Sequence, residues 1–262
     1  MKRIALILAL ALTAAVAVAA QDKPKPEAPK PDAPKADAKP AAALPAVDDI
    51  LAKYLKAVGG KEAIEKLSSR TAKGAFEIEA AGISGPFESY AKAPNKSALQ
   101  FSIPNIGNGA QVFDGQKAWD SSPMTGLREL GGEELAVMKR ESDFYRDLNL
   151  KKHYQKMEVK GKEKVGQSEA YVIEATPTEG GPEKLYFDAG TGLLVRQDAE
   201  RETGQGKLAI EIYLEDYKAV DGVNIPHRVR QVTPVFSMTI KFTEVKHNVP
   251  IDDAKFAKPA GN

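Results

Sequence analysis

Three histidines are the side chains of this chain best suited to catalysis or metal binding, and their spacing argues against both. His153, His227 and His247 lie far apart in the sequence. None has a second histidine one helical turn away with an acid between them, which is the arrangement of helical zinc sites. We therefore predict that His227 and His247 are surface or strand-edge side chains and that His153 is solvated.

Serine and glycine motifs give no catalytic pattern either. Residues 82–85 lack the glycine spacing of a nucleophile elbow, so we interpret Ser84 as a turn residue. Residues 106–109 have neither the following lysine nor the helix of a phosphate loop, and they predict a hairpin turn. The chain contains no cysteine, which excludes thiol catalysis and sulfur-ligated metals.

Two pairs of adjacent acids are candidate calcium ligands, but their pattern argues against that role. Asp252-Asp253 and Glu133-Glu134 lack the alternating oxygen pattern of a dedicated calcium loop. Glu133 and Glu134 fall in the first turn of a predicted helix, where acids interact favourably with the helix dipole. We predict a protein that is not an enzyme and that needs no metal or cofactor.

The elements that must position any site are mostly strands. After Arg70, apolar residues recur at every second position, the pattern of a strand with one buried and one wet face. Tight-turn signals such as Asp114-Gly115, residues 190–192 and Asp221-Gly222 separate these runs, and roughly ten or eleven antiparallel strands are expected. The alternation is clearest in residues 76–79, 99–103, 208–215 and 236–243.

Two helical segments interrupt the strands. Residues 48–66 carry apolar side chains at three- and four-residue steps, with Asp48 as the expected N-cap and Gly59-Gly60 as a break before a second short helix. Residues 131–144 predict a central helical insertion that extends weakly towards Tyr154. Its main apolar residues are Leu135, Val137 and Met138.

A long antiparallel sheet with one apolar face must curl or pair with another sheet. We predict a mainly β (α+β) fold: a half-open antiparallel β-barrel with an N-terminal helix and a central helical insertion against its concave face. An open apolar groove would accept hydrocarbon, because burying apolar surface stabilises by roughly 25 cal/mol per Å². The predicted lipid-binding residues are Leu99, Phe101, Ile103, Trp119, Met124, Ile210, Ile212, Leu214, Met238, Ile240 and Phe242.

Two groups of side chains in this prediction have alternative roles. Trp119, followed by Met124 and Leu127, suits either a loop that grips a lipid or ordinary core, and core is favoured. Arg128 and Arg140 suit either a headgroup phosphate or solvent, and solvent is favoured.

The first 45 residues predict export. A basic start, an apolar run over residues 4–20 and small residues at Val18 and Ala20 indicate a signal peptide over residues 1–20, with an uncleaved membrane anchor as the alternative. Residues 21–45 alternate proline with lysine and alanine, so a disordered tether is expected. Without cysteine there is nothing to acylate as a lipoprotein anchor. Residues 46–262 are expected to form one β domain.

Charge and size restrict the partners. The chain has 262 residues, 37 basic and 36 acidic, and loss of Lys2 and Arg3 with the signal leaves 35 basic residues. A nearly neutral protein without a basic block is not expected to bind nucleic acid. About 215 residues suffice for an ordinary core without disulfides.

Several short motifs resemble the outer-membrane lipoprotein-sorting superfamily of periplasmic carriers. They are residues 49–54 and 58–63, the hairpin at 186–194, the segment at 217–226, and the ending at 245–253 with Phe256 and Pro259. The resemblance implies a half-open antiparallel barrel, plugged by helices, that handles lipid or lipoprotein acyl chains. The chain differs from the dedicated carrier in length, and it has no residue that corresponds to a polar gate residue of that carrier.

These observations lead to two hypotheses from different classes. The first is a periplasmic, non-enzymatic binder of lipid or lipidated protein, soluble after signal cleavage or tethered to the inner membrane without it. Its partners would be acyl chains or lipoproteins, with no stable transmembrane segment after cleavage. The alternative is an accessory interaction module of an envelope protein complex, with no small ligand.

Overall fold

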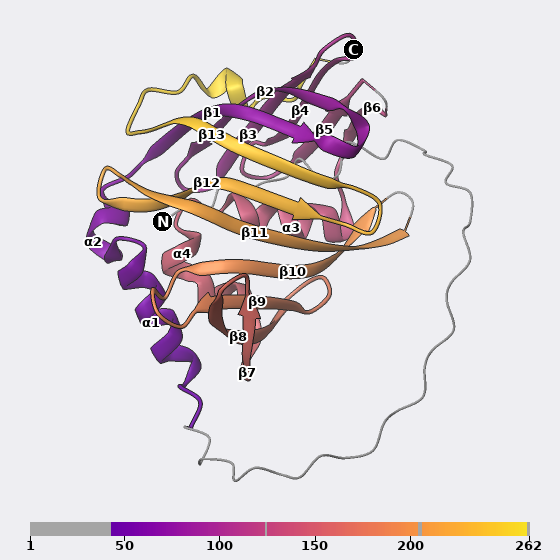
Figure 1. Cartoon of the computed structure of the whole chain (residues 1–262). Helices are drawn as coiled ribbons and strands as arrows, with labels where there is room; N and C mark the ends of the chain where they lie inside the picture. The colour runs from indigo at the N-terminus through magenta and orange to yellow at the C-terminus, as the bar shows by residue number, and fades with distance from the viewer. Residues whose placement is uncertain (1–42, 124, 204–205, 261–262) are drawn as a thin grey trace, which may run out of the picture.

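A computed structural model describes residues 43–123, 125–203 and 206–260, without the side chains of residues 202 and 203. The predicted signal peptide and most of the predicted tether lie outside the described residues. The described chain forms one sheet of 13 strands in the order β6-β5-β4-β3-β2-β1-β13-β12-β11-β10-β9-β8-β7. The end strands β6 and β7 do not pair with each other, so the curved sheet stays open, as predicted (Figure 1).

All the neighbouring strands pair antiparallel, and their bounds follow the alternation of the sequence. The strands exceed the ten or eleven expected partly because short ones such as β6, with four residues, carry little periodic signal. The bounds are β1 Ser69–Ile78, β2 Ile83–Lys92, β3 Lys96–Ile103, β4 Gly107–Phe113, β5 Ala118–Ser122, β6 Gly126–Glu129, β7 Tyr154–Val165, β8 Ser168–Pro177, β9 Glu183–Asp188, β10 Leu194–Thr203, β11 Gly206–Val220, β12 Val223–Val232 and β13 Ser237–His247.

Turn chemistry agrees with the sequence at three hairpins and differs at two places. The β4–β5, β9–β10 and β11–β12 turns contain glycines with positive φ at Gly115, Gly192 and Gly222. Ser84, expected in a turn, lies within β2 opposite Glu77. Residues 107–109, expected in a turn, instead begin β4.

Glycines leave room for aromatic rings on the inner side of the sheet. A Cβ at Gly109 would stand 2.1 Å from the Phe101 ring, and one at Gly74 would stand 2.8 Å from the Phe87 ring. Gly74 also adjoins a register shift between β1 and β13. Bulges of this kind bend a strand and increase its twist, which helps the sheet to curl.

Helices α1 (Val47–Ala57) and α2 (Gly60–Glu65) close one end of the curved sheet (Figure 1). The break between them falls at Gly59, whose φ is +119°. Asn224 at the start of β12 donates from its backbone N–H to the Val58 carbonyl and from its side chain to the Ala57 carbonyl. The prediction that Asp48 is the N-cap was wrong: Ala46 occupies that position with no side-chain cap, and Asp48 pairs with Lys151.

The central insertion follows β6 and returns the chain to β7. It consists of α3 (Gly132–Ser142), α4 (Arg146–Asn149) and a 3₁₀ turn η3 (Leu150–His153), so the predicted helix ends at Ser142 rather than continuing towards Tyr154. Helix α3 contacts β4 and β10, which six strands separate in the sheet. It therefore crosses the concave side from one part of the sheet to the other (Figure 1).

The opposite, convex face has its own core under the C-terminal segment. Ala98, Val112 and Trp119 alternate with inward-facing residues on β3–β5 and pack against Ile251 and Phe256. The 3₁₀ turn η4 (Asp253–Phe256) contacts β3 and presents Phe256 to this cluster. Another 3₁₀ turn, η2 (Glu79–Ala81), connects β1 to β2.

Candidate functional site

The inward side chains of β1–β3, β12 and β13 form a continuous apolar layer that is buried in the described chain, and we call this layer the apolar wall. Aromatic rings hold it together edge to face: the Phe76 and Phe101 centroids lie 6.0 Å apart, and those of Phe87 and Phe242 lie 5.1 Å apart. The wall consists of Phe76, Ile78, Phe87, Leu99, Phe101, Ile103, Val229, Met238, Ile240 and Phe242.

Most of the residues predicted from the sequence to bind lipid meet in or beside this wall. Leu214 belongs to the same cluster, and Ile212 packs against it. Ile210 is buried two positions earlier on β11. The wall itself contains Leu99, Phe101, Ile103, Met238, Ile240 and Phe242.

Two of the predicted lipid-binding residues do not meet the others there. Trp119 lies on the convex face, in the cluster beneath Ile251 and Phe256, which agrees with its interpretation as core. The alternation along β5 explains this, because Asp120 and not Trp119 shares a face with the wall residue Leu99. Met124 lies outside the described residues.

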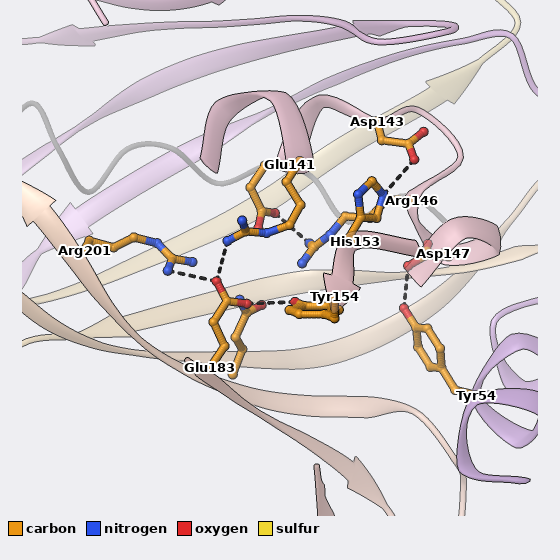
Figure 2. Close-up of polar contacts among 11 residues, drawn as sticks. Tyr54, Glu141, Asp143, Arg146, Asp147, His153, Tyr154, Glu183 and Arg201 are labelled. Carbon is orange, nitrogen blue, oxygen red and sulfur yellow. Dashed lines mark hydrogen bonds and ion pairs between the residues drawn. The ribbon is translucent and has the colours of Figure 1, made fainter. Parts of the chain in front are cut away.

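Beneath the central insertion, the concave face changes from apolar to ionic. The charged and polar side chains buried there form a group that we call the buried ion cluster. Figure 2 shows this cluster between α3, α4 and strands β9 and β10. At its centre Glu183, 1% exposed, accepts hydrogen bonds from Arg140 at 2.6 Å and Tyr154 at 2.8 Å, and Arg201 lies 3.0 Å away. The cluster comprises Arg140, Glu141, Arg146, Tyr154, Glu183, Gln197 and Arg201.

The cations decide the protonation state of Glu183. Burial by itself favours the neutral acid, but Arg201, Arg140 and Arg146 outweigh it and lower the pKa of Glu183 to about 2. Arg146, 2% exposed, donates to Glu141 at 2.6 Å. The cluster is therefore charged at neutral pH and ties α3 and α4 electrostatically to the sheet.

Further polar contacts join the insertion to its surroundings. The Tyr54 hydroxyl on α1 donates to Asp147 on α4 at 2.6 Å, and His153 lies 2.8 Å from Asp143 (Figure 2). Burial raises the pKa of Asp143, but hydrogen bonds from His153, Asn149 and the Tyr145 backbone outweigh it and leave that pKa lowered.

Three predictions about charged side chains were wrong. Arg140, expected in solvent, is 7% exposed because its guanidinium pairs with Glu183. His247, expected at the surface, is 8% exposed and lies 3.0 Å from Asp221. His153 is part-buried against Asp143 rather than solvated.

The sequence reasoning missed Glu183, although a signal was present. Glu183 alternates with Leu185 and Phe187 along β9, and both of these are fully buried. An acid in phase with buried apolar positions faces the interior, where it requires a partner. Gln197 and Arg201 show the same alternation on β10.

Two surface hollows lie on other parts of the sheet. One of about 480 Å³ is bordered by β2–β5 and the C-terminal residues Pro259 and Ala260. The other, of about 670 Å³, lies between β9–β11 and the β12–β13 turn, with Ile210 on its border. Neither has a residue of α3 in its lining, so the groove predicted beneath residues 131–144 stays a prediction.

The described residues also limit the chemistry. Within residues 43–123, 125–203 and 206–260, no three histidine, aspartate or glutamate side chains converge as metal ligands. The helices of that same part of the chain are all too short or too polar to cross a bilayer.

Sequence comparison gives no relatives. No protein-family model matches the chain, and no curated protein matches it either.

Comparison of structures defines the fold. A LolA superfamily protein from Nitrosomonas europaea superposes with a TM-score of 0.56 at 13% identity, over 82% of this chain and 99% of that one. A DUF1329 family protein from Desulfovibrio piger gives 0.55 at 14% identity, over 80% and 97%. A putative outer membrane lipoprotein-sorting protein domain from Vibrio parahaemolyticus gives 0.51 at 11% identity, over 80% and 94%. The chain therefore has the fold of the lipoprotein-sorting superfamily, and the resemblance drawn from the sequence is confirmed at this level.

Proposed function

We propose that the protein binds the acyl chains of lipids or lipidated proteins on its concave face and catalyses no reaction. The observation that carries this proposal is the apolar wall, which lies on strands between the two contacts of α3 with the sheet. Each methylene group transferred from water to such a surface gains about 0.8 kcal/mol, so one acyl chain supplies enough free energy for specific binding.

The likeness of fold supports the same proposal. One similar structure is a putative outer membrane lipoprotein-sorting protein domain, and another is a LolA superfamily protein. We extend to this chain the expectation of lipid or lipoprotein trafficking in the periplasm. The predicted lipid-binding residues on the wall are the proposed contacts.

Native mass spectrometry of protein purified from cell envelopes without detergent tests the proposal. The expected result is protein with a lipid-sized adduct, together with displacement of a fluorescent fatty acid by unlabelled lipid. Bare polypeptide that also fails to bind the added fatty acid would contradict it.

A matched pair of variants on β13 locates the site. Ile240 belongs to the apolar wall, and the side chain of its neighbour Thr239 lies on the other face of the sheet. We expect Ile240→Asn to weaken fatty-acid binding at least tenfold and Thr239→Asn to leave it unchanged, with folding of both checked by circular dichroism. Equal effects of the two substitutions would place binding elsewhere.

Export and the tether are part of the proposal. We infer cleavage after Ala20, so that the mature protein begins at Gln21 and lies in the periplasm. Amino-terminal sequencing of the protein from fractionated cells tests this inference. A protein that begins at Met1 in the membrane fraction would support the uncleaved anchor.

The alternative, an accessory module of an envelope complex, predicts a different result from cross-linked cells. Affinity capture would then recover a stoichiometric protein partner from cells, and the purified protein would carry no lipid.

A further inference from the structure

A row of polar side chains adjoins the apolar wall on the concave face. Leu99 on β3 pairs in register with Gln111 on β4, Gln111 pairs with Asp120 on β5, and Asp120 pairs with Arg128 on β6. Directly opposed residues in a sheet project to the same side. The row therefore leads from the wall towards the start of α3, where Arg128 binds Glu134.

Gln111 and Asp120 are buried without completing their hydrogen bonds. Gln111 is 2% exposed, and neither atom of its amide has a partner. Asp120 is 1% exposed; its Oδ1 has no partner, and its Oδ2 lies 3.5 Å from Nε of Arg128. Native proteins seldom bury polar atoms in this state, and each instance calls for an explanation, such as an ordered water, an ion or a bound ligand.

The position of this pair beside the wall indicates what kind of molecule would complete it. The Phe101 ring lies over Gly109, two residues before Gln111, and Leu99 stands directly opposite Gln111. A chain lying along the wall would therefore bring one of its ends next to Gln111 and Asp120. That end must be polar, because it meets an amide and a carboxyl group.

The charges of the row favour an uncharged group over an anion. Arg128 makes a two-point ion pair with Glu134, at 2.6 and 2.9 Å, so its positive charge is already engaged. Asp120 adds a further carboxylate, and burial raises its pKa. An anionic headgroup would meet this carboxyl without an available cation, whereas hydroxyl and amide groups would find both an acceptor and a donor.

We propose that Gln111 and Asp120 anchor the uncharged, hydroxyl- or amide-bearing headgroup of a lipid whose acyl chain lies on the apolar wall. This inference rests on the proposed function and adds a selectivity to it. The site discriminates against fatty-acid carboxylates of the same chain length. Gln111 donates from its amide nitrogen and accepts at its amide oxygen, and Asp120 accepts at Oδ1.

Competition between two lipids of equal chain length tests the anchor on the full mature protein. A monoacylglycerol and the corresponding fatty acid each displace a fluorescent acyl probe at pH 7.5. We expect the monoacylglycerol to bind at least tenfold more tightly to the native protein. Gln111→Leu, which removes the unpaired amide at similar volume, should reduce this preference to less than threefold.

Two further variants complete the experiment. Asp120→Asn keeps a polar side chain but removes the charge, and it should strengthen fatty-acid binding. The control is Gln100→Leu, the same substitution on the neighbouring strand β3. Gln100 follows Leu99 and lies on the other face of the sheet, so this variant should keep the native preference for the monoacylglycerol.

The outcomes distinguish the proposed headgroup anchor at Gln111 and Asp120 from the proposed binding of acyl chains. Equal binding of both lipids by the native protein, or an unchanged preference in Gln111→Leu, would overturn the anchor and leave acyl-chain binding intact. The second of these results would mean that water alone occupies the pair. Binding of neither lipid would overturn the proposed function and the anchor with it.

Discussion

The two halves of the concave face solve the same burial problem with opposite chemistry. On β1–β3, β12 and β13 the inward positions are aromatic and aliphatic, and they form the apolar wall. On β9 and β10 the inward positions include Glu183, Gln197 and Arg201. Gln197 and Arg201 contact Glu183, and Glu183 binds Arg140 of the central insertion. The difference teaches that the insertion is anchored by charge on one half, while apolar surface is concentrated on the other.

The two kinds of contact differ in how much geometry they require. A buried charge finds its partner only in specific geometry, whereas an apolar surface accepts any hydrocarbon that covers it. The ion pair between Arg140 and Glu183 fixes α3 on β9, while Phe144 and Leu150 of the insertion pack in the same buried cluster as the apolar wall.

The largest expected effect on stability comes from the half of the concave face on β9 and β10 that holds the buried ion cluster, which we call the ionic half. Glu183→Gln leaves Arg140 and Arg201 buried without their anionic partner, so we expect the free energy of unfolding to fall by about 3–5 kcal/mol. Urea denaturation measures the loss, and hydrogen exchange should show α3 and α4 becoming less protected than β1–β3. Glu200→Gln, at an exposed position on the same strand β10, serves as the control. Uniform loss of protection over both halves would contradict the division.

The second-largest effect is expected from acid, which should reduce the stability that the ion pairs of Glu183 contribute. The pKa of Glu183 is about 2 in the folded protein against 4.5 ordinarily, so its stabilisation is fully present above pH 4.5 and is lost as the pH falls towards 2. The difference amounts to about 3 kcal/mol. We expect the stability gap between the native protein and Glu183→Gln to narrow between pH 4.5 and 2.5 in urea titrations. A constant gap over that range would show that the carboxylate is not held in this way.

The smallest effect on stability is expected for a substitution in the apolar wall. Ile240→Val removes one buried methylene group, and we expect it to cost about 0.5–1.5 kcal/mol at every pH. Thermal unfolding at pH 7 and pH 4 checks this, with Thr239→Val on the other face as the control. A pH-dependent loss in Ile240→Val would mean that the two halves are coupled rather than independent.

The fold could be predicted where local sequence carries its pattern. Met238, Ile240 and Phe242 alternate with polar residues, so β13 and its buried face followed directly. The break at Gly59-Gly60 and the insertion near residues 131–144 were likewise local signals. The strand β6 was less visible, because four residues show almost no period.

The ionic half could not be predicted because its contacts are distant in sequence. Arg140 and Glu183 are 43 positions apart, and no spacing rule joins a helix to a strand across that interval. The amphipathic pattern of α3 is weak, because Arg140 and Ser142 are buried beside Met138. Arg140 was expected in water only because its partner, Glu183, is not adjacent to it in the sequence. Trp119 was likewise ambiguous until the register of β5 assigned it to the convex face.

The strand β7 pairs with β8 on one side only, and its outer edge has no neighbouring strand in the sheet. An open sheet exposes a row of backbone donors and acceptors that invites a foreign strand. Here register shifts at Tyr154/Lys156 and Val159/Gly161 interrupt that row, and four lysines line the strand. The border at the other end, β6, is only four residues long. Both margins resist templated self-assembly, so an incomplete barrel can persist in a crowded compartment without polymerising.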